Sequence, residues 1–375
     1  MKKLLSNIIY FFIFHLRIWK LFLSRYFGRH GSPVLAVFNY HRVIAEHRDS
    51  FIMEYEFGLL ARDFEKQMLW LKKNFKIIKV SDLSPSLLKK NSRKPLALIT
   101  FDDADSEFYD IAYPILKKHD LTAIMFVPTN FIESGKAFFH LRFTNLCNQL
   151  KNHDWGNILQ TELPSDIKDK LLKYKADFES NSRELRHDIG LSFFRMNREQ
   201  VEALLDKWES IGDIRYDLGI KCMSWDQIIE VHRQGIEIGS HSANHFQLAR
   251  MDEQAIKSEV TESRAELEKR LGVKIETISY PVGSYDDRVL EQTRLAGYKY
   301  GFTTREEIVT PDYLTDRPRE IPRISIGYAQ VYRIMHPFIK SLVINCSRQL
   351  SKTSNIDANK SQTESDKKKH IGNQG

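Results

Sequence analysis

The chain has 375 residues, 42% of them hydrophobic and 28% charged, which is enough for one large folded domain or two ordinary ones. The net charge of +7 is moderate, and much of the excess lies near the two ends of the chain. No nucleic-acid-binding signature accompanies these charges, so nucleic acid is not expected as a partner. The three cysteines are far apart and form no CxxC pair, which excludes a disulfide framework and argues against thiol chemistry.

The first 30 residues form a hydrophobic and basic segment. Leu4–Leu16 is largely apolar, but Arg17 and Lys20 interrupt the run before it reaches the roughly 20 residues that a spanning helix needs. The basic residues that follow the run would keep the rest of the chain on the cytoplasmic side of a membrane. We therefore expect residues 1–30 to form a membrane-associated helix on the cytoplasmic face. There are two alternatives. The segment could be an amphipathic helix packed on the catalytic domain, or it could be an uncleaved signal anchor with the rest of the protein exported.

From Pro33 onward, short apolar runs alternate with segments of helical periodicity. The expected strands are residues 34–40, 96–101, 122–127, 235–240, 276–280 and 299–303. The expected helices are residues 63–75, 111–119, 224–235, 252–271 and 286–296. This repeated order predicts an α/β fold with a parallel sheet or barrel.

Two segments depart from this alternation. Residues 131–222 are rich in charged and helix-forming residues, which predicts a helical insertion in a barrel domain of residues 31–335. Insertions that follow a barrel strand often shape the substrate mouth. Residues 347–375 have almost no large apolar side chains, so we expect a disordered polar tail.

Polar motifs follow three of the expected strands. Asp102 and Asp103 come directly after residues 96–101, and adjacent carboxylates at a strand end repel each other unless a cation lies nearby. His241 and His245 follow the strand at 235–240, and on a helical turn their spacing would place both imidazoles on one face, where they could bind one divalent ion. A polar loop start and a pair of surface histidines are the simpler alternatives. The absence of HExxH disfavours a zincin protease.

The third motif, Ser279–Tyr285 (SYPVGSY), follows the strand at 276–280. Its proline and glycine predict a turn whose backbone N–H groups point into the same cleft. Such donors are what a tetrahedral oxyanion needs.

Together these motifs resemble those of a known family. Thr100–Asp103 (TFDD), His241–His245 (HSANH) and Ser279–Gly283 (SYPVG) are similar, in order, to the first three motifs of the polysaccharide deacetylases, the NodB-homology group or carbohydrate esterase family 4. The resemblance covers roughly residues 33–326, interrupted by the insertion. It implies a distorted (β/α) barrel.

The resemblance also implies roles for these residues. Asp102 would be the general base, and Asp103, His241 and His245 would bind a divalent metal, usually zinc. The metal would polarise the acetamide carbonyl and activate the attacking water. The backbone N–H of Val282 would stabilise the oxyanion, and the substrate side of the site would include its neighbours Tyr280 and Pro281.

Two positions depart from the family pattern. Ala104 stands where the first motif usually has glycine, which is tolerable provided that the backbone does not need a positive φ. Ser279 stands where the third motif usually has the arginine that orients the catalytic aspartate. Arg323 is the expected substitute for that arginine, although a surface arginine would fit the sequence equally well.

The family's late histidine, which protonates the leaving amine, has no clear match near the carboxyl end. His41 follows the strand at 34–40, in a segment similar to that of deacetylases with permuted motif order. We therefore expect His41 to be the general acid, the alternative being a structural histidine.

The expected function is metal-dependent removal of N-acetyl groups from amino sugars, in a glycan or a lipid-linked precursor. Placement at the membrane would favour the precursor. A carbohydrate-binding pseudoenzyme is one alternative, and its support is the departures at Ala104 and Ser279. An esterase acting on O-acetyl groups of sugars is the other, because it would use the same residues.

Overall fold

The structure is a computed structural model, and it describes residues 34–45, 58–90, 92, 94–134, 138–193, 196, 198–215 and 221–326. The predicted N-terminal helix and the predicted polar tail lie outside the described residues, so both stay predictions. Within the described residues, no helix combines the length and the apolar character needed to cross a membrane.

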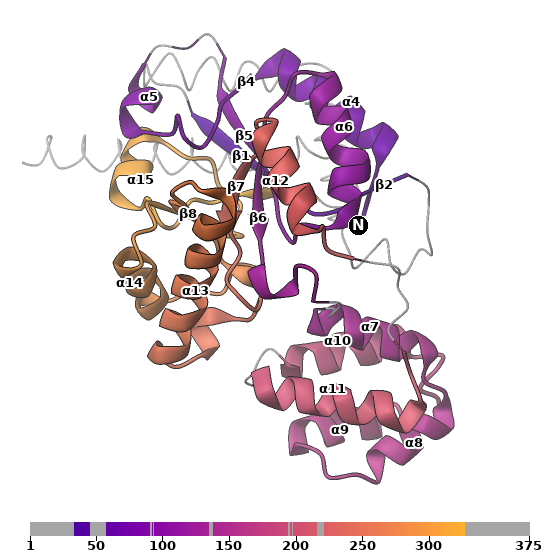
Figure 1. Ribbon diagram of the computed structural model, residues 1–375. Coiled ribbons are helices and arrows are strands. Elements are labelled where there is room, and N and C mark those ends of the chain that lie inside the picture. Colours follow the sequence, from indigo (N-terminus) through magenta and orange to yellow (C-terminus); the bar gives the residue numbers. More distant parts are fainter. Residues whose placement is uncertain are drawn as a thin grey trace, which may run out of the picture.

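A parallel sheet forms the centre of the molecule (Figure 1). Its strands run in the order β10-β1-β5-β6-β7-β8-β9, and the short strand β4 (Lys76–Ile77) pairs with the start of β5. A parallel bridge from Phe302 to Ile321 links the β9 edge to the segment that leads into β10, so the sheet curls back on itself. The expected distorted barrel is thereby confirmed. The bounds of the strands are Leu35–Tyr40 (β1), Leu96–Phe101 (β5), Ile124–Val127 (β6), Glu237–Ser240 (β7), Thr277–Ser279 (β8), Tyr300–Phe302 (β9) and Ile324–Ser325 (β10).

Helices cover the outer face of this sheet (Figure 1). Local signals set their ends: Ser224 forms a capping box at the start of α12, and Gly272, with a φ of 68°, ends α13. The main flanking helices are Ala61–Asn74 (α4), Tyr113–Lys118 (α6), Trp225–Arg233 (α12), Glu253–Leu271 (α13) and Asp287–Leu295 (α14). A π-helical turn, Phe108–Ala112, precedes α6 where the sequence predicted a regular helix. The short elements that the sequence pattern did not predict are Val43–Ile44 (β2), Leu59–Leu60 (β3), Pro85–Lys89 (α5), Pro311–Asp316 (α15), β4 and β10.

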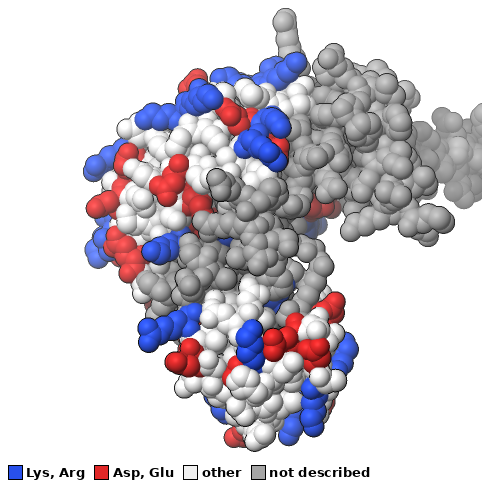
Figure 2. Space-filling model, turned by 90° about the vertical axis from the view of Figure 1, so that its right-hand side faces the viewer, with Lys and Arg blue, Asp and Glu red and all other residues white. Residues whose placement is uncertain are grey.

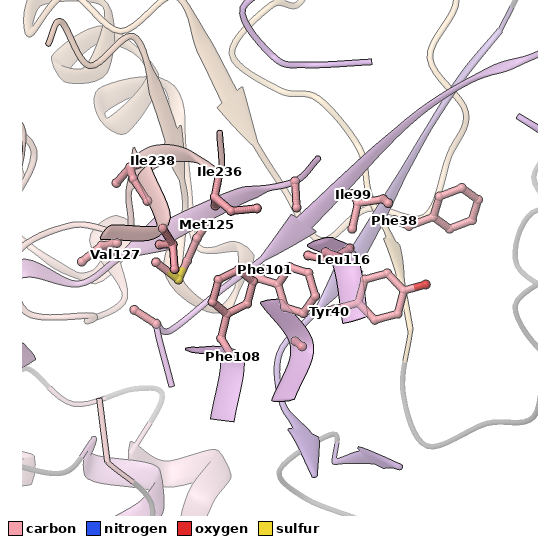
Figure 3. Packing of buried hydrophobic residues seen from close by; sticks show 14 of the residues in the cluster. Phe38, Tyr40, Ile99, Phe101, Phe108, Leu116, Met125, Val127, Ile236 and Ile238 are labelled. Atoms are coloured by element: carbon pink, nitrogen blue, oxygen red, sulfur yellow. The ribbon is translucent and has the colours of Figure 1, made fainter. Parts of the chain in front are cut away.

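Side chains of the central strands alternate between the two faces of the sheet. Phe38, Tyr40 and Phe101 point outward and pack with Phe108 in the core beneath the helices (Figure 3). The opposite face is apolar at the start of β1 and β5, but it becomes polar toward their carboxyl ends, at Asn39 and in Thr100 and Asp102. The interior of the barrel is therefore filled with apolar side chains at the amino ends of the strands and is polar at their carboxyl ends.

Five helices of the described residues, α7 to α11, form a second body beyond the end of β6 (Figure 1). They have their own hydrophobic core, in which Trp155 and Trp208 are almost fully buried. Phe246, the residue after His245, belongs to this second core. The helices thus pack directly against the loop that carries the second motif. Their bounds, all inside the predicted insertion, are Phe139–Gln149 (α7), Asn152–Leu159 (α8), Ser165–Lys173 (α9), Ser182–Phe193 (α10) and Arg198–Gly212 (α11).

Charged side chains are distributed over both bodies. On the face shown in Figure 2, basic and acidic residues are interspersed over the barrel and the helical body rather than segregated by sign. This face therefore presents no broad field of one charge that would steer a substrate.

Candidate active site

The predicted motifs meet at the carboxyl ends of the strands. Asp102 and Asp103 follow β5, the histidine motif follows β7, and Ser279 ends β8. The prediction of a helical turn for His241–His245 is wrong, because these residues form an irregular loop. The φ angles of Ser242 and His245 are 60° and 49°, and these left-handed residues bend the loop so that both imidazoles reach Asp103.

Backbone strain is concentrated in these motifs. Eight described non-glycine residues have a positive φ, and five of them belong to the three motifs: Asp103, Ala104, Ser242, His245 and Val282. Such conformations cost about 1–3 kcal/mol each and persist where the surrounding structure enforces them, typically at functional sites.

Ala104 is one of these strained residues, with a φ of 55° and a fully buried side chain. Ala104→Gly removes a left-handed penalty of roughly 1–2 kcal/mol. It also loses about 0.8 kcal/mol of methyl burial and about 0.5–1 kcal/mol to the greater backbone freedom of glycine. We therefore expect the free energy of unfolding, measured by urea denaturation, to change by less than about 1 kcal/mol. Ala104→Val should lose more than about 2 kcal/mol through strain and overpacking, and equal losses in both variants would contradict this account.

Asp103, His241 and His245 form a compact group of ligand atoms, all within 4.8 Å of one another. The Nε2 atoms of His241 and His245 lie 3.5 Å and 3.1 Å from Asp103 Oδ1. That oxygen is buried and accepts no hydrogen bond from the described residues. A divalent cation would satisfy it.

The protonation of His241 fits this interpretation. Its Nδ1 lies 2.8 Å from the carbonyl oxygen of Ser279, which assigns the proton to Nδ1 and leaves the Nε2 lone pair facing Asp103. Burial lowers the pKa of His241 to about 4, so the imidazole is neutral at pH 7, as a metal ligand must be.

Arg323 is fully buried and holds Asp102 with two hydrogen bonds. Its Nη1 donates to Asp102 Oδ1 and its Nη2 to Asp102 Oδ2, both at 2.8 Å. Nη2 also donates to Ser279 Oγ at 2.9 Å, so the guanidinium reaches the position where the family usually has an arginine. Burial alone would raise the pKa of Asp102, but the charge and the hydrogen bonds of Arg323 contribute most to outweighing it and lowering that pKa to about 2.

Asn39 and Thr100 complete this network, and neither was predicted. Asn39 Nδ2 donates to Asp102 Oδ2 at 3.3 Å, and Asn39 Oδ1 accepts from Arg323 Nη1 at 2.8 Å. Thr100 Oγ1 donates to Asn39 Oδ1 at 3.0 Å. A polar residue near the end of an otherwise apolar buried strand is the signal that could have identified both.

His41 lies beside Asp102 and is partly exposed. Its Nε2 is 3.9 Å from Asp102 Oδ2, and 23% of its side chain is exposed. The next residue, Arg42, is buried and forms an ion pair with Glu107 at 2.6 Å, which fixes the chain where it leaves β1. His41 thus stands beside the carboxylate and is partly accessible to solvent.

In the third motif, Tyr280 and Pro281 are buried and Val282 is exposed. The prediction that Tyr280 takes part in the site is wrong for its side chain, which is fully buried in the outer core and donates to the carbonyl of Arg319. Strand alternation explains this, because Ser279 points into the barrel and its neighbour therefore points out. Pro281 is buried in the turn, whereas Val282 has a φ of 55° and a side chain that is 50% exposed.

The helical body contributes side chains next to the second histidine. The rings of Phe138 and His140 have centroids 4.5 Å and 5.9 Å from that of His245. Burial lowers the pKa of His140 to about 4, so this imidazole is also neutral at pH 7. No sequence motif marks these residues, because their place at the site depends on how the insertion packs.

Comparison with known proteins agrees with this geometry. The family model for polysaccharide deacetylases matches residues 89–301, which include all three motifs but neither His41 nor Arg323. The chain is 26% identical over 298 residues to the poly-β-1,6-N-acetyl-D-glucosamine N-deacetylase of Staphylococcus aureus, covering 77% of each chain. It is 24% identical over 272 residues to the enzyme of the same name from Staphylococcus epidermidis, covering 72% of this chain and 68% of the relative.

A solved structure shares the fold. The deacetylase PplD of Streptococcus pyogenes, solved in complex with acetate, superimposes with a TM-score of 0.54 at 18% identity, covering 83% of this chain and 99% of that one. The family match extends over more than half of the chain and includes the strands that carry the three motifs. The chain therefore belongs to the polysaccharide deacetylase family.

Proposed function

We propose that the protein is a metal-dependent hydrolase that removes N-acetyl groups from the amino sugars of a glycan or of its lipid-linked precursor. The observation that carries the proposal is the meeting of Asp103, His241 and His245 beside a carboxylate, Asp102, that a buried arginine holds ionised. The names of the staphylococcal relatives support N-acetylglucosamine as the sugar. Zinc is the cation that the ligand set favours.

Asp103, His241 and His245 would hold the cation. When bound, it supplies a Lewis acid that polarises the acetamide carbonyl and lowers the pKa of the attacking water. Asp102 accepts the proton of that water, and Arg323 keeps the carboxylate oriented and charged while the C–O bond forms.

The remaining steps use His41 and the third motif. The backbone N–H of Val282 would donate to the oxyanion, and the left-handed conformation of this residue would fix the direction of the bond. His41, which is partly exposed and lies 3.9 Å from Asp102, would protonate the amine as the C–N bond breaks. Acetate and the free amino sugar are the products.

The position of Arg323 weakens the alternative of a pseudoenzyme. That alternative rests on Ala104 and Ser279, yet Arg323 contacts both Ser279 and Asp102 and so can replace the missing arginine. Ala104 adopts the left-handed conformation that glycine would adopt there.

The test is to purify the full-length chain, measure bound metal, and assay acetate release from β-1,6-linked N-acetylglucosamine oligomers, a lipid-linked N-acetylated precursor and an O-acetylated sugar. We expect stoichiometric metal and release from an N-acetylated substrate. Asp102→Asn should keep the metal but lose about 10²–10⁴-fold in kcat, whereas His241→Ala should lose both metal and activity.

His153→Ala is the matched control, because His153 is an exposed histidine on α8. It should behave as wild type. Failure of the wild-type chain to bind Zn²⁺, Co²⁺ or Mn²⁺ would overturn the proposal, and release from the O-acetylated sugar alone would replace it with the esterase.

A further inference from the structure

A buried carboxylate on α13 holds the loop that carries both histidines. Glu259 is 6% exposed. Its Oε2 accepts hydrogen bonds from the backbone N–H groups of Ala243 at 3.0 Å and Asn244 at 2.8 Å. Its Oε1 accepts from Asn244 Nδ2 at 2.7 Å. All three donors belong to the residues between His241 and His245.

Regular secondary structure does not hold this loop. The segment after β6 binds one side of it, because the backbone N–H groups of Thr129 and Asn130 donate to the carbonyls of Ser242 and Ala243, and Asn130 Nδ2 donates to Asn244 Oδ1. The backbone N–H groups of Ala243 and Asn244 depend on Glu259. The loop is neither helix nor strand, and Ser242 and His245 are strained in the left-handed region. Side-chain oxygens therefore take over from secondary structure: Ser242 N–H donates to Ser240 Oγ at 3.2 Å, and His245 N–H donates to Ser242 Oγ at 3.0 Å. Glu259 supplies the two acceptors between these bonds and is the charged member of the set.

The spacing of the two imidazoles depends on this loop. Metal–ligand distances in a sound site lie within about 0.2 Å of their standard values. Charge-assisted bonds to the backbone keep the loop in its strained conformation before any cation arrives, so the site is preorganised. Removing the carboxylate charge would weaken the bonds to the N–H groups of Ala243 and Asn244, and only the bonds to Thr129 and Asn130 would then hold the middle of the loop at full strength. His241 would stay fixed through its bond to the Ser279 carbonyl. The position of His245 relative to His241 would then vary.

We propose that Glu259 is a positioning residue that sets the distance between the His241 and His245 imidazoles and thereby the affinity of the site for its divalent cation. This inference rests on the proposed function only in that it takes these histidines as metal ligands. It assigns Glu259 no contact with substrate or with the cation.

The test compares Glu259→Gln with Glu262→Gln, a control on an exposed position of the same helix. Zn²⁺ affinity of the full-length protein is measured by competition with a chromophoric chelator, and the melting temperature of each metal-free protein is recorded separately. Loss of groups that orient metal ligands commonly weakens binding by about 10–100-fold, and we expect a loss in this range for Glu259→Gln only. Co²⁺-loaded Glu259→Gln should show an altered visible spectrum, which a loss of stability alone would not produce.

Asn244→Ala provides a second variant in case Glu259→Gln fails to fold. It removes one of the three donors to Glu259, together with the bond from Asn130 Nδ2, but leaves the backbone bonds to Glu259, so a smaller loss of Zn²⁺ affinity is expected. Zn²⁺ affinity within twofold of wild type in Glu259→Gln would overturn the inference, as would an unchanged affinity in Asn244→Ala if Glu259→Gln cannot be purified. Neither result would affect the proposed function, which instead fails if the wild-type protein binds no metal.

Discussion

Replacing Arg323 with methionine is expected to abolish acetate release and to destabilise the fold by about 3–5 kcal/mol, because it leaves the buried charge of Asp102 without its partner. Both terminal nitrogens of Arg323 donate to that carboxylate, and its Nε donates to the carbonyl of Thr303. Arg323→Lys should restore little, since one ammonium group cannot reproduce the planar fork. Urea denaturation and acetate release measure the two effects, and near-normal turnover in Arg323→Lys would contradict the account.

The pH dependence of the stability loss provides an independent check. The pKa of Asp102 is lowered to about 2 in the folded protein, so its interaction with Arg323 stabilises the fold above the ordinary carboxyl pKa and is lost as the pH falls toward 2. The stability difference between wild type and Arg323→Met should therefore be largest above about pH 4 and should shrink on acidification. A difference that is independent of pH would indicate that packing, rather than the ion pair, carries the effect.

A transplanted arginine tests whether Arg323 substitutes for the family residue. The Ser279 hydroxyl already accepts a bond from Arg323, so a side chain that starts at residue 279 points toward the place where the guanidinium meets Asp102. The double variant Ser279→Arg, Arg323→Ser should recover measurable acetate release relative to Arg323→Ser alone. Recovery would be partial for two reasons. Both positions are fully buried, so the exchanged side chains must repack. The carbonyl oxygen of Thr303 also loses the hydrogen bond that Arg323 Nε donates. No recovery in a folded double variant would mean that the two positions are not equivalent.

The sequence pattern correctly predicted the elements that depend on residues close together in the chain. Leu96–Phe101 is an uninterrupted apolar run and forms β5 at the predicted residues. The predicted end of α13 at Gly272 is also confirmed, because a left-handed residue stops the helix there. Strand ends and helix caps depend on neighbours in sequence, so the positions of the aspartates and histidines on one edge of the sheet followed from them.

The features that were missed depend on contacts distant in sequence. His140 lies beside His245 only because the insertion packs through Phe246. The strained φ of Ser242 is maintained by tertiary contacts of the loop, so an HxxxH spacing alone could not distinguish a loop from a helical turn. Tyr280 could have been excluded from the sequence, since Ser279 and its neighbour must point to opposite faces of the strand.

His41→Ala is the second variant with a large expected effect. If His41 protonates the leaving amine, its removal should lower kcat by about 10²–10⁴-fold. Metal content should not change, because His41 is not among the three residues whose ligand atoms converge. The fold should also persist, since the neighbouring ion pair of Arg42 with Glu107 remains in place. Turnover, bound metal and melting temperature are measured on the same preparation.

The leaving group distinguishes an acid from a structural histidine. An amine must be protonated before the C–N bond can break, whereas the phenolate of an activated acetate ester leaves without a proton. His41→Ala should therefore retain most of its activity on 4-nitrophenyl acetate while losing it on the N-acetylated sugar. Equal losses on both substrates would show that His41 acts by holding Asp102, which lies 3.9 Å away, and not by donating a proton. Near-normal turnover of the sugar would exclude both roles, and the proton for the amine would then have to come from another residue at this edge of the sheet.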